Sequence, residues 1–189
     1  ETLARVHMAV GLDRVPVLAN ALASSAPEAR DAPRGDIRLG LCGECGMIAN
    51  VAFDPAALAY TPAYENSLDY SARFQAYARD LAGRLIETYD LVGKTIVEIG
   101  CGKGAFLGLL CEMGGNDGIG FDPSYDGPRE LRCGAGRMEF VPALYGDAGA
   151  DRAADFISCR HVLEHIPRPL AFLEPILRAA RIRGATVFF

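Results

Sequence analysis

The chain of 189 residues contains no tryptophan, no surplus of basic residues and no long hydrophobic run. It carries 19 Lys and Arg residues against 24 Asp and Glu residues, which gives a formal net charge of −5 at pH 7. Because a basic surplus is needed to displace counterions from phosphates, no nucleic-acid partner is expected. The longest uncharged apolar run, residues 105–111, is far shorter than the ~20 residues that cross a bilayer, so no membrane partner is expected either.

The start of the sequence also lacks the pattern of a secretory signal, since the first ten residues carry charges and a histidine where an apolar segment is required. The six cysteines are therefore expected to be reduced, in a cytoplasmic protein. Half of the residues are hydrophobic and 23% are charged, which is ordinary for a globular protein. This length allows about one to one-and-a-half domains with a normal core.

Composition and pattern change near residue 65, and we expect two domains, residues 1–65 and 66–189. The first is rich in Ala, Pro and Gly and predicts a small irregular module. Two short strands are expected around the tight turn at Cys42–Gly46. These two strands are predicted at 37–41 and 47–53. The module is also expected to contain a strand or helical turn at 15–22 and a loop at 26–38.

Residues 66–189 alternate between helix and strand patterns. Strands that alternate with helices predict an α/β fold, with a doubly wound, Rossmann-like parallel sheet and helices on both faces. Such folds bind ligands beyond the carboxyl ends of their strands. The predicted helices are 67–89, capped by Ser67 or Ser71, 105–113 and 169–180, and the predicted strands are 94–100, 117–121, 138–141, 155–159 and 185–189.

A glycine-rich turn, Glu98-x-Gly100-x-Gly102-x-Gly104, joins the first of these strands to a helix. Glycines let the backbone approach a ligand closely at such a turn. The P-loop spacing is absent, whereas Gly100, Gly102 and Ala105 satisfy the looser form of a dinucleotide-binding fingerprint. Glu98 would repel a pyrophosphate, and the third glycine follows after one residue instead of two. These two features favour a ligand with cationic character over a nicotinamide dinucleotide.

The turn resembles the first motif of class I S-adenosylmethionine-dependent methyltransferases. Residues 118–125, with Asp122 at the end of the second strand, resemble the second motif, and residues 154–167 resemble the strand-four motif that lines the transfer site. The resemblance implies that Glu98 orients the amino group of the cofactor, that Asp122 accepts hydrogen bonds from the ribose hydroxyls, and that Asp147 reaches the adenine amino group. The implied cofactor-binding residues are Glu98, Gly100, Cys101, Gly102, Gly104, Phe121, Asp122, Pro123, Asp147 and Arg160.

The N-terminal module is similar to that of a methyltransferase subgroup with a zinc-binding module, whose members include sugar C-methyltransferases. The similar segments are 41–50, 53–55 and 64–68. The resemblance implies Cys42 and Cys45 as metal ligands. A structural zinc needs four ligands, and His7 is the one further candidate, so zinc is possible but its ligand set is incomplete.

A candidate catalytic pair follows the fourth strand of the sheet. His161 and His165 are predicted on one helical face with Glu164 adjacent. His165 is expected to make a structural hydrogen bond, whereas His161, nearer the end of the strand, is the candidate general base. Arg160 beside it could also hold a phosphate or carboxylate of the substrate.

The sequence predicts S-adenosylmethionine-dependent methyl transfer to a small molecule. Carbon of a sugar or related metabolite is one acceptor that the resemblance implies, and oxygen and nitrogen acceptors stay open. A full class I sheet has two strands more than this sequence shows, so the C-terminal strands of the full fold are expected to be missing. Two alternatives remain, an NAD(P)-dependent oxidoreductase and a non-catalytic cofactor-binding or scaffold protein.

Overall fold

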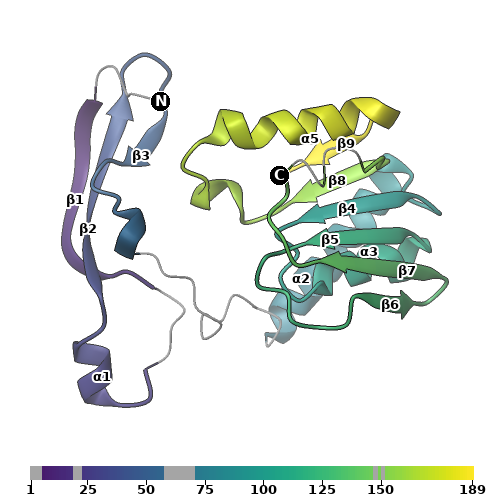
Figure 1. Ribbon diagram of the computed structural model, residues 1–189, viewed down its shortest axis with the longest axis horizontal. Coiled ribbons are helices and arrows are strands. Elements are labelled where there is room, and N and C mark those ends of the chain that lie inside the picture. The colour runs from purple at the N-terminus through teal and green to yellow at the C-terminus, as the bar shows by residue number, and fades with distance from the viewer. Residues whose placement is uncertain (1–5, 19–22, 58–70, 147–148, 150–151) are drawn as a thin grey trace. The chain divides into compact units, whose positions relative to one another are not determined.

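The computed structural model describes residues 1–189 except 1–5, 19–22, 58–70, 147–148 and 150–151. The chain forms two compact units, Glu1–Asn66 and Ser67–Phe189, whose elements are labelled in Figure 1. Among the described residues, no helix combines the length and the hydropathy needed to cross a membrane.

The N-terminal unit is an antiparallel sheet in the order β1-β2-β3. Strands β2 and β3 overlap the two strands predicted around the turn at Cys42–Gly46, and the module is more regular than expected because β1 pairs with β2 along its length. Its longest strand, β1, runs mostly over residues for which no strand was predicted, and only its last two residues overlap the strand or helical turn expected at 15–22. Register shifts between Met8 and Val10 and between Leu12 and Val15 interrupt the alternation of side chains that would have indicated it. The elements are β1 (Val6–Pro16), α1 (Ala26–Arg30), β2 (Arg34–Cys42), β3 (Ile48–Asn50) and the 3-10 helix η1 (Pro55–Ala57).

The segment predicted as a loop, residues 26–38, instead contains helix α1 and the first part of β2. Reciprocal hydrogen bonds stabilise the start of this helix. Ser25 Oγ accepts from Glu28 N at 3.4 Å, while the Glu28 carboxylate accepts from the backbone N and the Oγ of Ser24 at 2.8 and 2.6 Å. A helix of five residues is too short to show a helical period in its sequence, which explains the wrong prediction.

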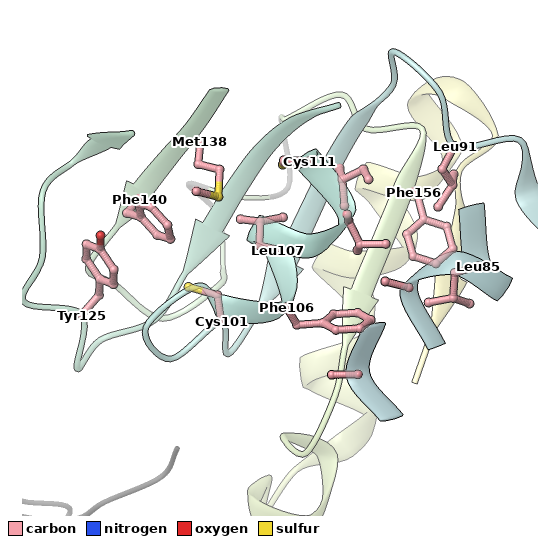
Figure 2. Packing of buried hydrophobic residues seen from close by; sticks show 14 residues of the cluster. Leu85, Leu91, Cys101, Phe106, Leu107, Cys111, Tyr125, Met138, Phe140 and Phe156 are labelled. Carbon is pink, nitrogen blue, oxygen red and sulfur yellow. The ribbon is translucent and has the colours of Figure 1, made fainter. Parts of the chain in front are cut away.

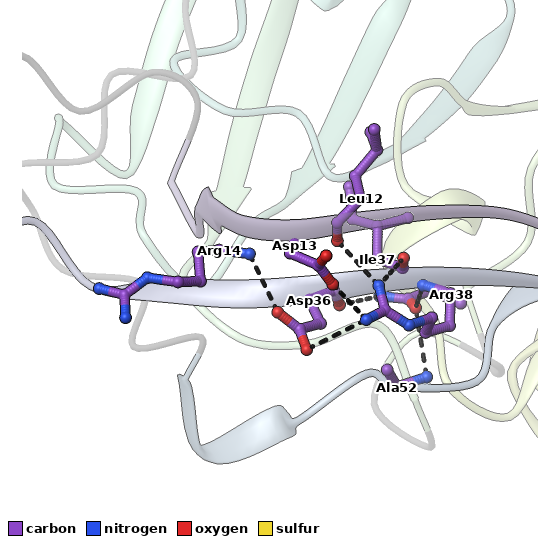
Figure 3. Close-up of polar contacts among 8 residues, drawn as sticks. Leu12, Asp13, Arg14, Asp36, Ile37, Arg38 and Ala52 are labelled. Atoms are coloured by element: carbon purple, nitrogen blue, oxygen red, sulfur yellow. Dashed lines mark hydrogen bonds and ion pairs between the residues drawn. The ribbon is translucent and has the colours of Figure 1, made fainter.

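Arg38 connects the strands of the N-terminal unit (Figure 3). Its guanidinium donates to the backbone oxygens of Leu12 and Ile37, each at 3.1 Å. It also forms ion pairs with Asp13 and Asp36. Strand β3 is joined to this network because Asn50 Oδ1 accepts from the Arg38 backbone N at 2.8 Å. Arg38 thus satisfies polar groups from all three strands of a unit that has few buried apolar residues.

The C-terminal unit is a six-stranded sheet in the order β6-β7-β5-β4-β8-β9, which confirms the doubly wound α/β fold (Figure 1). All neighbouring strands are parallel except β6 and β7. The strands are β4 (Thr95–Ile99), β5 (Asp117–Phe121), β6 (Glu130–Cys133), β7 (Gly136–Val141), β8 (Phe156–Cys159) and β9 (Thr186–Phe188), and the helices are α2 (Ala72–Tyr89), α3 (Ala105–Gly114), the 3-10 helix η2 (Leu163–His165) and α5 (Pro169–Arg183).

Two apolar clusters fill the faces of this sheet. Helices α2 and α3 cover one face and α5 covers the other. The central strand β4 contributes to both, since Ile96 belongs to the first cluster and Val97 and Ile99 to the second. Figure 2 shows the first cluster, in which the rings of Tyr125 and Phe140 stack with their centroids 4.1 Å apart.

The edge hairpin β6-β7 was not predicted, although the sequence contains a signal for it. Cys133 pairs with Gly136, so the connection has two residues and begins at Gly134, whose φ is 58°. A glycine with positive φ at the first position is typical of a tight hairpin turn. The residues of β6 are mostly exposed and two of the four are charged, so no buried run indicated a strand.

The helix limits differ from the predictions by a few residues. Ser71, one of the two residues predicted to cap α2, is its N-cap. The Ser71 Oγ accepts a hydrogen bond from Phe74 N at 3.3 Å. The other candidate, Ser67, lies outside the described residues. Helix α5 continues to Arg183 before Gly184 ends it with a φ of 69°.

Candidate functional site

The glycine turn lies at the carboxyl end of β4, beside the end of β5. Gly100 N and Cys101 N both donate to the Phe121 backbone oxygen, at 2.8 and 3.2 Å. Gly100 and Gly104 adopt φ values of 69° and 79°, which favour glycine. A Cβ at Gly104 would also lie 2.5 Å from the Phe140 ring. Packing and backbone conformation therefore both require glycine here, and the turn is fixed against the neighbouring strand.

Glu98 is buried at the end of β4 and faces the start of α3. Its Oε2 accepts a hydrogen bond from Leu107 N at 3.0 Å. Gly104, the N-cap of α3, has no side chain that could satisfy the free N–H groups of the first turn, so Glu98 takes this role from the strand. Burial raises the pKa of Glu98 to about 8, although the Arg160 cation and the Leu107 N–H favour the ionised carboxylate.

Asp122 follows β5 and is also buried. Its Oδ2 accepts from Gly102 N at 2.8 Å, which connects the carboxylate to the glycine turn. Its Oδ1 accepts from the backbone N and the Oγ of Ser124, at 2.8 and 2.6 Å. The charge of Asp122 further raises the pKa of Glu98, so the two carboxylates are close enough to repel each other.

Arg160 follows β8, the neighbour of β4 in the sheet. Its guanidinium lies over the Phe106 ring, 3.7 Å from the centroid. Its Nη1 is buried and has no hydrogen-bond partner within the described part of the chain. The end of β8 therefore adds a cation to the edge of the sheet where β4 and β5 place their carboxylates.

A cavity of about 570 Å³ lies between the first turns of α2 and α3 and reaches Arg160. Alanines of both helices, Phe106 and Leu109 give its described lining a mainly apolar character. Arg79 and Arg160 are the cationic members of this lining, and no acidic residue is among the described residues that form it.

The structure brings together four of the predicted elements of the site, namely Glu98, the glycine turn, Asp122 and Arg160. Three other predicted residues have different surroundings. Phe121 is buried under α5, where its ring meets the edge of Tyr145 at 5.1 Å. Pro123 is exposed, and Cys101 fills space beside Gly120 in the interior. Asp147 lies outside the described residues.

His161 does not share a helical face with His165, and this prediction is wrong. His161 has a φ of 55°, and the following 3-10 helix covers only Leu163–His165. The left-handed residue turns the chain between the strand and this short helix, so the i, i+4 relation of a helix does not apply. The His161 side chain is 71% exposed, and its Nδ1 lies 3.7 Å from Glu164 Oε1.

Cys42 and Cys45 lie at the turn between β2 and β3, in the other compact unit. Cys42 is buried and Cys45 is exposed. Backbone N–H groups of Cys45 and Glu44 lower the pKa of the Cys42 thiol. Within the described ranges, no group of three or more His, Cys, Asp or Glu residues is placed to hold a metal ion, and His7 does not complete one.

Sequence reasoning missed three residues of this region. Ser124 fixes the Asp122 carboxylate, and its place two residues after an aspartate is the usual signal for such a turn. Phe106 supports Arg160, and Arg79 reaches the cavity from α2. No local pattern in the sequence indicates the last two roles, because both depend on residues that are distant in the chain.

Comparisons with known proteins agree with this geometry. A family model described as a methyltransferase domain matches residues 70–189. The chain is similar to a ubiquinone biosynthesis O-methyltransferase of Methylococcus capsulatus, with 32% identity over 109 residues, which are 53% of this chain and 44% of the relative. A protein of the same name from Paraburkholderia xenovorans is 29% identical over 107 residues, 52% of this chain and 44% of that relative. The match thus spans less than half the length of these relatives.

Proposed function

The chain belongs to the methyltransferase domain family, and on this basis we propose that it binds S-adenosylmethionine and transfers a methyl group to a hydroxyl oxygen of a small molecule. The observation that carries the proposal is the Asp122 carboxylate, which Gly102 N holds at 2.8 Å beside the glycine turn. It stands at the carboxyl edge of the sheet, where doubly wound folds bind their ligands.

The residues present fit this cofactor. Glu98 and Asp122 are two buried acidic side chains at the same edge of the sheet. A ligand with a cationic group would favour the ionised form of Glu98, whose pKa burial raises to about 8. An ionised carboxylate has about four acceptor sites, and three of those of Asp122 are used by Gly102 and Ser124, so one is left for a ribose hydroxyl. We propose that Gly100, Cys101, Gly102 and Gly104 offer backbone to the same ligand.

S-adenosylmethionine, when bound, supplies a methyl group activated by its sulfonium. The task of the chain is then to hold the acceptor in line with that group, and positioning alone can lower such a barrier by ~7–11 kcal/mol. We propose His161 as the base that takes the hydroxyl proton of the acceptor. Glu164, 3.7 Å from its Nδ1, stabilises the imidazolium that results.

An oxygen acceptor is favoured because the two relatives carry the name O-methyltransferase. Transfer to carbon of a sugar is the second candidate, and it rests on the likeness of the N-terminal segment to sugar C-methyltransferases. A carbon acceptor would require a stronger base and stabilisation of an enolate. Family membership speaks against the dinucleotide oxidoreductase. Zinc at Cys42 and Cys45 stays a prediction, which metal analysis of the purified protein tests.

Calorimetry of the purified chain with S-adenosylmethionine, its demethylated product and NAD tests the proposed cofactor. We expect Asp122→Ala to weaken binding of the demethylated product by about 1–3 kcal/mol, because hydrogen bonds to an ionised group are lost. Asp126→Ala, which removes an exposed carboxylate from the same loop, is the matched control and should bind normally.

Binding of NAD without either sulfur compound would refute the proposed function. Equal affinity of the Asp122→Ala variant and the wild type would remove Asp122 from the site. Cofactor binding without methyl transfer to any phenol, catechol or nucleotide sugar would favour the non-catalytic alternative.

A further inference from the structure

The cavity between α2 and α3 is lined in part by Arg160. The charge of this guanidinium interacts with Glu98, but its Nη1 is buried and has no hydrogen-bond partner among the described residues. Buried polar groups are normally paired, and an unpaired buried donor of a charged group is especially unfavourable. Since Arg160 lines a cavity of about 570 Å³, a ligand bound in this cavity is the candidate for the missing partner.

The guanidinium is held in place for this partner. It lies on the Phe106 ring at 3.7 Å, and Phe106 itself is 8% exposed in the core under α2 and α3. A planar guanidinium fixed on a ring presents its N–H groups in a fork that matches a carboxylate or a phosphate. Little rotational freedom is left to be lost when an anion binds.

The lining of the cavity indicates the rest of the ligand. Arg79 adds a second positive charge from α2, and the described lining contains no carboxylate that would repel an anion. Its other described residues are alanines of the two helices, Phe106 and Leu109, with Gln75 as the single uncharged polar side chain among them. This surface suits an apolar skeleton and offers few partners for the hydroxyl groups of a sugar.

We propose that the cavity binds the carboxylate of the methyl acceptor and that the acceptor is an aromatic or aliphatic hydroxy acid. This inference rests on the proposed function, since it names the substrate class of the same site. Arg160 binds the carboxylate, and Arg79 adds long-range attraction. S-adenosylmethionine also has a carboxylate, but its polar skeleton matches the apolar lining less well.

Benzoate and its neutral analogue benzamide are suitable probes because they share a skeleton and differ in charge. Binding to the full chain is measured by calorimetry, with and without the demethylated cofactor product. We expect the wild type to bind benzoate and to bind benzamide at least about tenfold more weakly. Arg160→Gln should lose at least about tenfold in benzoate affinity, and Arg160→Lys should regain part of it.

Arg84→Gln is the matched control, since Arg84 lies on α2, is exposed and pairs with Asp80. It should bind benzoate like the wild type. Equal benzoate affinity of the wild type and Arg160→Gln overturns the proposal, as does the absence of benzoate binding to the wild type. If Arg160→Gln loses affinity for S-adenosylmethionine and keeps its affinity for benzoate, the cavity holds the carboxylate of the cofactor, and the proposed acceptor class is wrong.

The two proposals fail in different ways. A chain that binds benzoate through Arg160 but binds neither S-adenosylmethionine nor its demethylated product has an anion site and lacks the proposed function. A chain that binds the cofactor but no benzoate retains the proposed function without this acceptor class. Thermal unfolding of each variant separates loss of affinity from loss of the fold.

Discussion

Glu98 combines a structural and a ligand-facing role in one side chain. It completes the N-terminal turn of α3 through Leu107 N, and it stands near Asp122 and Arg160 at the edge of the sheet. Burial raises its pKa from 4.5 to about 8. A group whose folded pKa is raised binds protons more tightly in the folded state, so for a carboxyl group stability falls as pH rises between these two values.

The pH dependence of stability tests this role. For Glu98→Gln we expect a smaller loss of the free energy of unfolding between pH 4.5 and about 8 than for the wild type. The amide oxygen can still accept from Leu107 N, so the helix start is kept. Urea unfolding at several pH values measures the difference, with the exposed Glu87→Gln on α2 as the control. Identical slopes for the two variants would contradict the assignment.

At the scale of elements, the parts that were predicted are those with short apolar runs or helical apolar periods. The five parallel strands and the helices of the C-terminal unit follow from these patterns, and the glycine turn follows from its spacing. Strands β1 and β6 were missed because their described residues are mostly exposed and form no buried run, whereas the edge strands β3 and β9 were predicted. His161 was placed on a helix because the sequence does not reveal its left-handed φ of 55°.

The glycine turn joins β4 to α3, and at Gly104 it leaves no room for a side chain. A substitution at this residue tests the condition. Gly104→Ala must adopt a φ of 79° and place a methyl group 2.5 Å from the Phe140 ring. We expect it to lower the free energy of unfolding by about 2–4 kcal/mol, the sum of backbone strain and overpacking. Gly93→Ala, with a φ of 62° and open space around it, should cost only about 1–2 kcal/mol. Equal losses in chemical denaturation would show that packing against Phe140 does not matter.

At the scale of the molecule, the two compact units differ in what stabilises them. Every member of the two apolar clusters belongs to the unit Ser67–Phe189. The N-terminal unit depends more on strand pairing and on the Arg38 network. Cys42 and Cys45 lie in the N-terminal unit, which has no such apolar cluster among its described residues. The proposed transfer site lies in the unit Ser67–Phe189, which contains both clusters.

Separate production of residues 67–189 tests whether the sheet needs the first unit. We expect this shorter protein to fold cooperatively and to bind the demethylated cofactor product within about threefold of the full chain, because it contains Glu98, Asp122 and the glycine turn. Circular dichroism and calorimetry provide the two measurements. A molten or insoluble product would show that residues 1–66 contribute to the stability of the sheet.

The cysteines differ in exposure, so their reactivity with a thiol reagent reports which part of the protein opens. Cys45 is exposed, whereas Cys101, Cys111 and Cys159 are buried, and burial raises the pKa of each of these three thiols. A thiol reagent therefore modifies Cys45 in the native protein and reaches the others only when their surroundings separate. Since Cys101 is part of the glycine turn and Cys111 is a buried residue of α3, the order in which they are labelled distinguishes local opening of the ligand site from unfolding of the whole sheet.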